Sequence, residues 1–241
     1  MSPSFTLKEG ALLLGDAHYS HLRPELLKLM EDIASKKLQI PQLVLMGDVL
    51  DALFGDVSYL LQENSIIVQL IQKISQEIEV IYLEGNHDFN LKNLFKDAKI
   101  FSIQEQPVIA DYGGKTIALA HGDFDGVLSY RLYSSIIRNR WVLKLLSAID
   151  TKIGNKIIKK LDIYLGKKED CKEFRGFQEY LEKRHLEKYR CNFFIEGHYH
   201  QNRSYTFETF EYINLAAFAC NQRYFIVKSL QDRALLEEKE L

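Results

Sequence analysis

Short apolar runs alternate with longer helical patterns along the first half of the chain. Residues 11–14, 43–46 and 80–83 are apolar runs short enough to be buried strands, and each is soon followed by glycine and then Asp or Asn. Between them, residues 24–37 and 59–78 place apolar side chains at helical spacing. This β-α-β-α-β order predicts an α/β fold with a parallel sheet, whose ligand sites lie at the carboxyl ends of the strands.

The second half of the chain has a different pattern. Residues 107–110 and 116–120 flank a Tyr-Gly-Gly turn, which predicts a hairpin, and further β-like runs follow after residue 190. Helical periodicity dominates residues 122–190. We therefore expect one domain, with a core of residues 1–121 and 191–241 and a helical insertion, or cap, at residues 122–190.

Charge separates these two parts. The chain is 46% hydrophobic and 27% charged with a net charge of -2, as expected for a globular protein. Residues 122–190 hold 16 Lys and Arg against 10 Asp and Glu, whereas the remainder holds 15 against 23. The acidic core argues against nucleic acid as a partner, although the basic insertion leaves a nuclease as an alternative function.

The cysteines and the apolar runs indicate in which cellular compartment the protein is located. Cys171, Cys191 and Cys220 are odd in number and form no Cys-x-x-Cys pair, so we expect reduced cysteines that serve only in packing. The N-terminal residues do not resemble a signal peptide, and no apolar run reaches the roughly 18 residues of a membrane span. We expect a cytoplasmic protein that could lie on the inner face of the membrane.

Polar residues follow the predicted strands in a recurring way. Five of the seven histidines come directly after such strands, and only His21 and His185 do not. Imidazole and carboxylate together suit manganese, iron or zinc, and the absence of a thiolate argues against a structural zinc site. The candidate metal ligands are Asp16, His18, Asp48, Asn86, His121, His198 and His200.

The ordered set Asp-x-His, Gly-Asp, Gly-Asn-His-Asp, His and Gly-His-x-His resembles the calcineurin-like metallophosphoesterase family. The resemblance covers residues 11–215 and implies a four-layer αββα sandwich with two divalent metal ions. Carried over by position, it implies two metal sites that share Asp48 as a bridge. One site would use Asp16, His18 and His200, and the other Asn86, His121 and His198. A shared anionic carboxylate also suits two cations that repel each other.

The remaining polar residues of these loops suggest supporting roles. We expect His87 to protonate or stabilise the leaving oxygen, with Asp88 orienting its ring; the alternative is a structural loop histidine. Asp123 is the candidate hydrogen-bond partner of a metal-bound imidazole. We treat Asp51, Asp56 and Asp125 as solvated or supporting residues.

Residues 128–149 and 153–165 predict two basic amphipathic helices. Their apolar faces could simply pack on each other and on the core. Alternatively they could cap the metal site, offering apolar surface to a lipid and cations to phosphates or to an anionic membrane.

The insertion follows His121-Gly122-Asp123 and contains Tyr130 and Arg138-Asn139-Arg140-Trp141. With these local matches it resembles the insertion of the UDP-2,3-diacylglucosamine diphosphatases, which act in lipid A biosynthesis. The resemblance implies manganese as the metal, a lipid-linked pyrophosphate as the substrate, and UMP and 2,3-diacylglucosamine 1-phosphate as the products. The expected substrate contacts are Tyr130, Arg131, Arg138 and Trp141.

Two departures from that subfamily leave other functions open. His87 stands where those enzymes usually carry Arg, and the loop between Gly122 and Tyr130 is shorter than theirs. A histidine suits an alkoxide-like leaving group, so a soluble nucleotide, phosphodiester or phosphoprotein is the alternative substrate. A non-catalytic module that binds a membrane or a partner is the alternative of another class.

Overall fold

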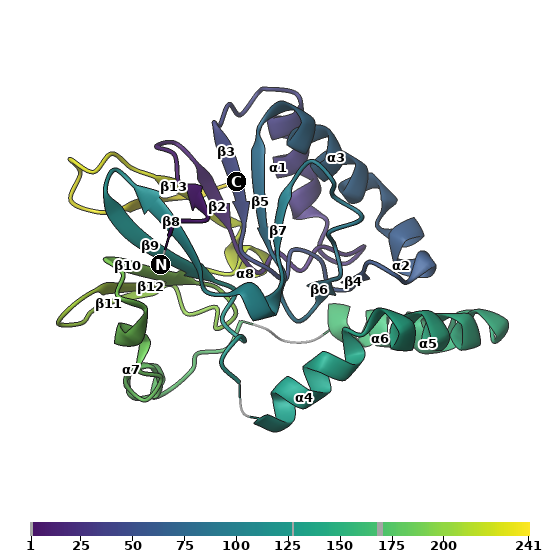
Figure 1. Ribbon diagram of the computed structural model, residues 1–241. Coiled ribbons are helices and arrows are strands. Elements are labelled where there is room, and N and C mark those ends of the chain that lie inside the picture. The colour runs from purple at the N-terminus through teal and green to yellow at the C-terminus, as the bar shows by residue number, and fades with distance from the viewer. Residues whose placement is uncertain (1, 127, 168–170) are drawn as a thin grey trace.

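The computed structural model describes residues 2–126, 128–167 and 171–241. Two six-stranded sheets pack face to face, and helices flank them (Figure 1). The first sheet contains, in spatial order, β14 (Leu236–Glu240), β13 (Arg223–Val227), β2 (Leu12–Leu14), β3 (Gln42–Leu45), β5 (Glu79–Leu83) and β7 (Lys99–Phe101). The second contains β1 (Phe5–Thr6), β8 (Val108–Tyr112), β9 (Lys115–Ala120), β10 (Phe193–Glu196), β12 (Glu211–Asn214) and β11 (Arg203–Thr206).

The β-α-β-α-β prediction for the first half is confirmed. Strands β2, β3 and β5 are parallel neighbours, and helices α1 (Glu25–Ala34) and α3 (Ser65–Glu77) follow the first two strands. The predicted helix at 59–78 is divided into α2 (Ser58–Glu63) and α3, because the Asn64 side chain donates to the carbonyls of Ala52 and Leu60 at 3.1 and 2.9 Å. A short pair of strands, β4 (Leu53–Phe54) and β6 (Asp88–Phe89), lies near the carboxyl ends of β3 and β5.

Alternation along the strands explains the layers. Leu12 and Leu14 pack with α1 and α3, whereas Leu13 between them packs on the second sheet. The outer face of the second sheet is covered by α7 (Phe177–Glu182) and the 3-10 helix η2 (Leu186–Tyr189). The four layers are therefore α1/α3, two sheets, and α7, so the αββα prediction is confirmed, with the fourth layer supplied by residues 177–189.

The other helices of residues 122–190 extend away from the sheets (Figure 1). They are α4 (Leu128–Ile137), α5 (Arg140–Lys152) and α6 (Lys156–Gly166). The helix predicted at 128–149 breaks at Asn139, whose side chain accepts from the backbone N–H groups of Trp141 and Val142 and so begins α5. Leu143 and Ile158 anchor the helix pair on Phe89 and Val57.

The expectation of three unpaired cysteines is wrong for two of them. Cys171 and Cys220 form a disulfide, whereas Cys191 is a buried free thiol. Cys220 lies in the short helix α8 (Phe218–Asn221), where Ala219 N–H donates to the Asp16 carbonyl at 3.1 Å. The disulfide thus joins the end of the insertion to a helix that contacts the β2 loop.

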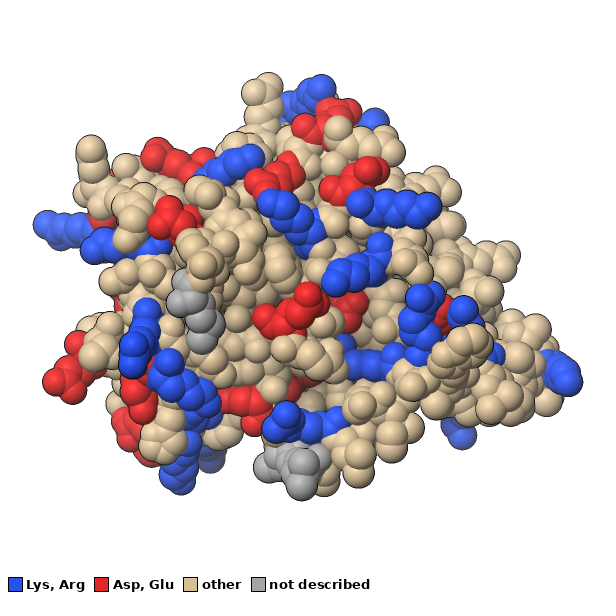
Figure 2. All heavy atoms as spheres, in the orientation of Figure 1, with Lys and Arg blue, Asp and Glu red and all other residues tan. Residues whose placement is uncertain are grey.

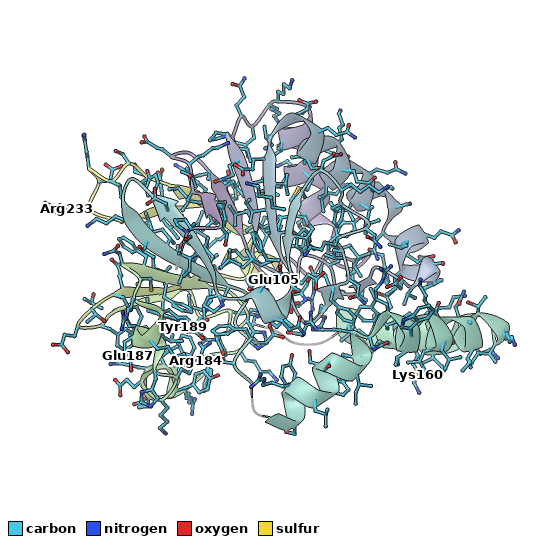
Figure 3. All side chains as sticks on the ribbon, viewed as in Figure 1. Glu105, Lys160, Arg184, Glu187, Tyr189 and Arg233 are labelled. Atoms are coloured by element: carbon cyan, nitrogen blue, oxygen red, sulfur yellow. A yellow bond between two sulfur atoms is a disulfide. The ribbon has the colours of Figure 1, made fainter. Side chains whose placement is uncertain are left out.

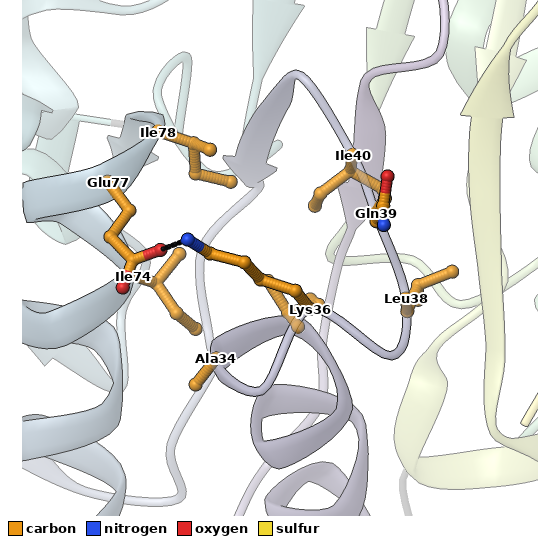
Figure 4. Close-up of a pocket in the computed structure, with 9 residues that line it drawn as sticks. Ala34, Lys36, Leu38, Gln39, Ile40, Ile74, Glu77 and Ile78 are labelled. Atoms are coloured by element: carbon orange, nitrogen blue, oxygen red, sulfur yellow. Dashed lines mark ion pairs between the residues drawn. The ribbon is translucent and has the colours of Figure 1, made fainter.

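Within the described residues, no helix has both the length and the apolar character needed to cross a membrane. A pocket of about 280 Å³ lies between the C-terminal ends of α1 and α3, where Lys36 Nζ and Glu77 Oε2 pair at 2.8 Å (Figure 4). It adjoins the residues that precede β3 and β5, at the edge of the sheet opposite the strand ends with the predicted ligands.

Candidate metal centre

The structure brings the seven predicted metal ligands together where strands of both sheets end. Five of them have left-handed backbone, with φ between 46° and 63°: Asp16, His18, Asp48, His198 and His200. Such a conformation costs a non-glycine residue about 1–3 kcal/mol and persists where the surrounding structure enforces it, commonly at functional sites. Gly47 is required here, because its φ is 89° and an added Cβ would lie 2.6 Å from His121 Nδ1.

A first cluster contains Asp16, His18 and His200. His200 Nε2 lies 3.1 Å from Asp16 Oδ1, and the rings of His18 and His200 are 5.5 Å apart. Burial raises the pKa of Asp16, but the neighbouring His200 outweighs burial and the pKa is lowered overall. Neither ring nitrogen of His18 has a hydrogen-bond partner. One ligand atom each from Asp16, His18 and His200 lies within 4.8 Å of the other two, an arrangement that suits a divalent cation.

A second cluster contains Asp48, His121 and His198, with Asn86 at its edge. His121 Nε2 lies 3.4 Å from Asp48 Oδ2, 3.3 Å from Asn86 Oδ1 and 3.1 Å from His198 Nδ1. The other ring nitrogen of His121, Nδ1, bonds to the Met46 carbonyl at 3.0 Å, which leaves Nε2 free to bind a cation.

Asp48 connects the two clusters. It also groups with His18 and His87 within 4.8 Å, so its carboxylate faces both sides of the centre. Burial raises the pKa of Asp48, but the imidazoles of His121 and His87 outweigh this and lower it well below its usual range. The clusters therefore fit a centre for two metal ions with one shared carboxylate.

His87 is adjacent to this centre, and its partner differs from the predicted one. Its Nε2 lies 3.9 Å from Asp48 Oδ2, and its Nδ1 bonds to the Asp51 carbonyl at 2.8 Å. The expectation that Asp88 orients this ring is wrong. The Asp88 carboxylate instead accepts hydrogen bonds from the backbone of Asp48, Val49 and Gly85 and from the Tyr82 hydroxyl, at 2.6 to 3.0 Å. Asp88 thus fixes the loop that presents Asp48.

Asp51 has a larger role than the sequence suggested. It is 1% exposed, and its Oδ1 lies 3.3 Å from His18 Nδ1 and 3.6 Å from Arg23 Nη1. Its position three residues after Asp48, in an otherwise apolar stretch, was a signal of burial.

Asp123, by contrast, is not the partner of His121; it accepts from the Tyr130 hydroxyl at 2.7 Å.

The four residues expected to contact substrate lie in different surroundings. Tyr130 lines a pocket of about 320 Å³ that also contains Asn86 and His198. Arg138 is 8% exposed and donates to the Gly85 carbonyl at 2.8 Å, beneath the metal-centre loop. Trp141 is 82% exposed on α5, beside Lys144, and is not among the residues that line this pocket.

Arg184 is a supporting residue that the sequence did not single out. It is buried, and it lies close to Tyr189 (Figure 3). Its guanidinium pairs with the fully buried Glu196 and with Asp125 at 2.9 Å, and it contacts the Gly122 carbonyl at 3.4 Å. Arg184 therefore joins the loop after His121 to the strand that leads to His198.

The sequence profile of the calcineurin-like phosphoesterase family matches residues 11–202. A UDP-2,3-diacylglucosamine hydrolase of Pseudomonas putida (strain F1) is 28% identical over 154 residues, which cover 62% of this chain and 64% of the relative. The protein of that name from Pseudomonas fluorescens (strain SBW25) is 26% identical, over 62% and 61%. The chain thus spans about three-fifths of the length of these relatives. A solved archaeal phosphodiesterase aligns over 96% of this chain and 99% of its own, with 13% identity and a TM-score of 0.47.

Proposed function

Because the chain belongs to the calcineurin-like phosphoesterase family and is a metal-dependent phosphoesterase, we propose that it cleaves the pyrophosphate bond of a lipid-linked sugar nucleotide. The proposed reaction converts UDP-2,3-diacylglucosamine to 2,3-diacylglucosamine 1-phosphate and UMP, as in lipid A biosynthesis. The observation that carries the reaction class is the pair of His/Asp clusters that Asp48 connects, as a member of the second cluster that also groups with His18 of the first. The name of the relatives supports the choice of substrate.

In this proposal Asp16, His18 and His200 hold one cation, and the second cluster holds the other, with Asp48 shared and manganese as the preferred ion. When bound, such ions activate water as a nucleophile and neutralise charge on the phosphoryl oxygens. We assign to His87 the donation of a proton to the leaving oxygen. Two contacts support this assignment: its Nδ1 bonds to the Asp51 carbonyl, and its Nε2 faces the Asp48 side of the centre.

The helices of the insertion support a lipid substrate. Large apolar side chains on α5 and α6 are between 36% and 82% exposed: Trp141, Leu145, Leu146, Ile149, Ile157, Leu161, Ile163 and Tyr164. Two neighbouring helices with this many exposed apolar side chains are consistent with a binding face. Lys and Arg side chains border this part of the molecule (Figure 2), and Lys160 extends from α6 (Figure 3). We propose that this face contacts acyl chains and the anionic inner membrane surface.

Turnover assays separate the substrates. Purified protein with Mn²⁺ should hydrolyse UDP-2,3-diacylglucosamine, and EDTA or Asp48→Ala should abolish hydrolysis. Turnover of bis(p-nitrophenyl) phosphate without turnover of the acylated sugar nucleotide would reject the lipid substrate and favour the soluble phosphodiester to which His87 is suited.

Vesicle sedimentation tests the membrane contact. Binding to vesicles containing phosphatidylglycerol should fall several-fold in Trp141→Glu/Leu145→Glu, whereas Ile66→Glu, at a 59% exposed position on α3, should bind like the unmodified protein. Equal binding by all three proteins would exclude the α5/α6 face.

A further inference from the structure

A cavity of about 770 Å³ lies beside the metal centre, between α4, the loop after His121 and η2, and its lining includes the 3-10 helix η1 (Ile103–Glu105). Asp123, Asp125 and Tyr130 line both this cavity and the smaller pocket that contains Asn86 and His198. A ligand with one end at the metal centre can therefore extend into the cavity.

The inner wall of the cavity contains an acceptor without a donor. Asp123 is 7% exposed, and only its Oδ2 accepts a hydrogen bond, from the Tyr130 hydroxyl at 2.7 Å. Its Oδ1 is buried and has no hydrogen-bond partner. A buried acceptor left unpaired costs about 1–3 kcal/mol, so this atom favours a ligand with a hydroxyl or N–H group.

The rim of the cavity carries hydrogen-bond donors, in contrast to the acceptor on its inner wall. Arg131 from α4 and Lys188 from η2 are both exposed, and neither forms an ion pair with an acidic residue in the described part of the chain. Lys188 lies over the ring of Tyr189 at 5.1 Å, and Ser135 and Gln104 add further polar groups. These side chains can donate hydrogen bonds, so they favour a ligand that presents oxygen acceptors along its length.

The cavity is also distinct from the proposed lipid face. Eight exposed large apolar residues lie on α5 and α6 and none of them lines the cavity, whereas α4 presents Arg131, Ser134 and Ser135 to it together with the apolar Leu132. A polar ligand with both donors and acceptors matches this lining better than an acyl chain does.

We propose that this cavity binds a phosphorylated sugar, with Asp123 Oδ1 accepting from a sugar hydroxyl and Arg131 and Lys188 facing its acceptor oxygens. The proposal rests on the function proposed above, in which the substrate joins two such sugars through a pyrophosphate. The sugar is either the ribose of the nucleotide or the glucosamine. The substrate would then lie with its polar part in this cavity and its acyl chains toward α5 and α6.

Isothermal titration calorimetry of the Mn²⁺-loaded protein tests this assignment, with UMP, N-acetylglucosamine 1-phosphate and inorganic phosphate as probes. Arg131→Ala/Lys188→Ala should raise the Kd of one sugar phosphate at least tenfold, and the probe affected identifies the sugar. The Kd of inorganic phosphate should change less than twofold. Arg175→Ala/Lys183→Ala, at exposed positions of the insertion outside the cavity lining, is the matched control and should leave every Kd unchanged.

Binding of neither sugar phosphate, or equal Kd values in the unmodified protein and the cavity variant, would overturn the assignment. The titration measures binding and not turnover. Failure to hydrolyse the acylated substrate would therefore reject the proposed function, whereas equal Kd values would reject only the sugar-phosphate site.

Discussion

Replacing Arg184 with methionine should destabilise the protein more than other arginine substitutions in the insertion. The change leaves Glu196, which is 0% exposed, without its cation and removes the pair with Asp125, whose side chain is 20% exposed. Burial raises the pKa of Glu196 and the guanidinium of Arg184 opposes this rise, so the carboxylate depends on that cation.

The magnitude follows from these two pairs. Breaking a buried ion pair by removing one partner costs about 3–5 kcal/mol, and a partly exposed pair adds up to about 1 kcal/mol. We expect a loss of about 4 kcal/mol in the free energy of unfolding, which for a domain of this size lowers the Tm by roughly 8–16 °C. Urea unfolding followed by circular dichroism measures the first quantity and calorimetry the second.

A second variant separates the ion pair from simple packing. Arg184→Met/Glu196→Gln removes the unpaired charge and keeps an acceptor for the Tyr212 hydroxyl, which donates to Glu196 at 2.8 Å. This double variant should recover about 2 kcal/mol relative to the single variant. Arg175→Met, at an exposed position, should change stability by less than about 0.5 kcal/mol. A loss below about 1 kcal/mol in Arg184→Met, or no recovery in the double variant, would refute the reasoning.

Three further predictions concern the metal centre and the cysteines. His87→Gln should lower kcat about 10²-fold or more for a diester with an alkoxide leaving group. The loss should be much smaller for a p-nitrophenyl ester, because nitrophenolate leaves without protonation. Equal losses for both substrates in steady-state assays would show that His87 is not the acid. Asp88→Asn should reduce the Mn²⁺ affinity and lower the unfolding free energy by about 1–3 kcal/mol, because both carboxylate oxygens accept hydrogen bonds from the Asp48 loop and an amide offers only one acceptor oxygen. Asp97→Asn, at an exposed position, should change neither quantity, and an unchanged metal titration of Asp88→Asn would contradict the prediction. Burial raises the pKa of Cys191 to about 11, so a thiol reagent at pH 8 should find no reactive thiol in the folded protein. It should find one thiol after unfolding and three after unfolding and reduction, and two or more in the unreduced protein would disprove the disulfide.

Local patterns in the sequence determined the main features of this protein. Apolar runs of strand length separated by helical periodicity predict the β2-β3-β5 sheet, because the spacing of buried side chains is fixed by the local geometry of each element. The positions of Asp16 and Asp48 after β2 and β3 predict where a metal site can form, since parallel strands end at one edge of the sheet. His121 follows β9 of the second sheet, so the packing of the two sheets brings it to the same place. These residues and their order are the basis of the proposed reaction class.

Contacts between distant segments could be decided only by the tertiary structure. His87 takes the Asp51 carbonyl rather than Asp88 as its partner, because the β3 loop passes beside it, 36 residues away along the chain. Arg184 meets Asp125 across 59 residues, and Cys171 meets Cys220 across 49. Neither periodicity nor spacing encodes such pairs, because they depend on how the layers pack. The sequence therefore predicted the candidate metal ligands, and the fold shows which residues hold them in place.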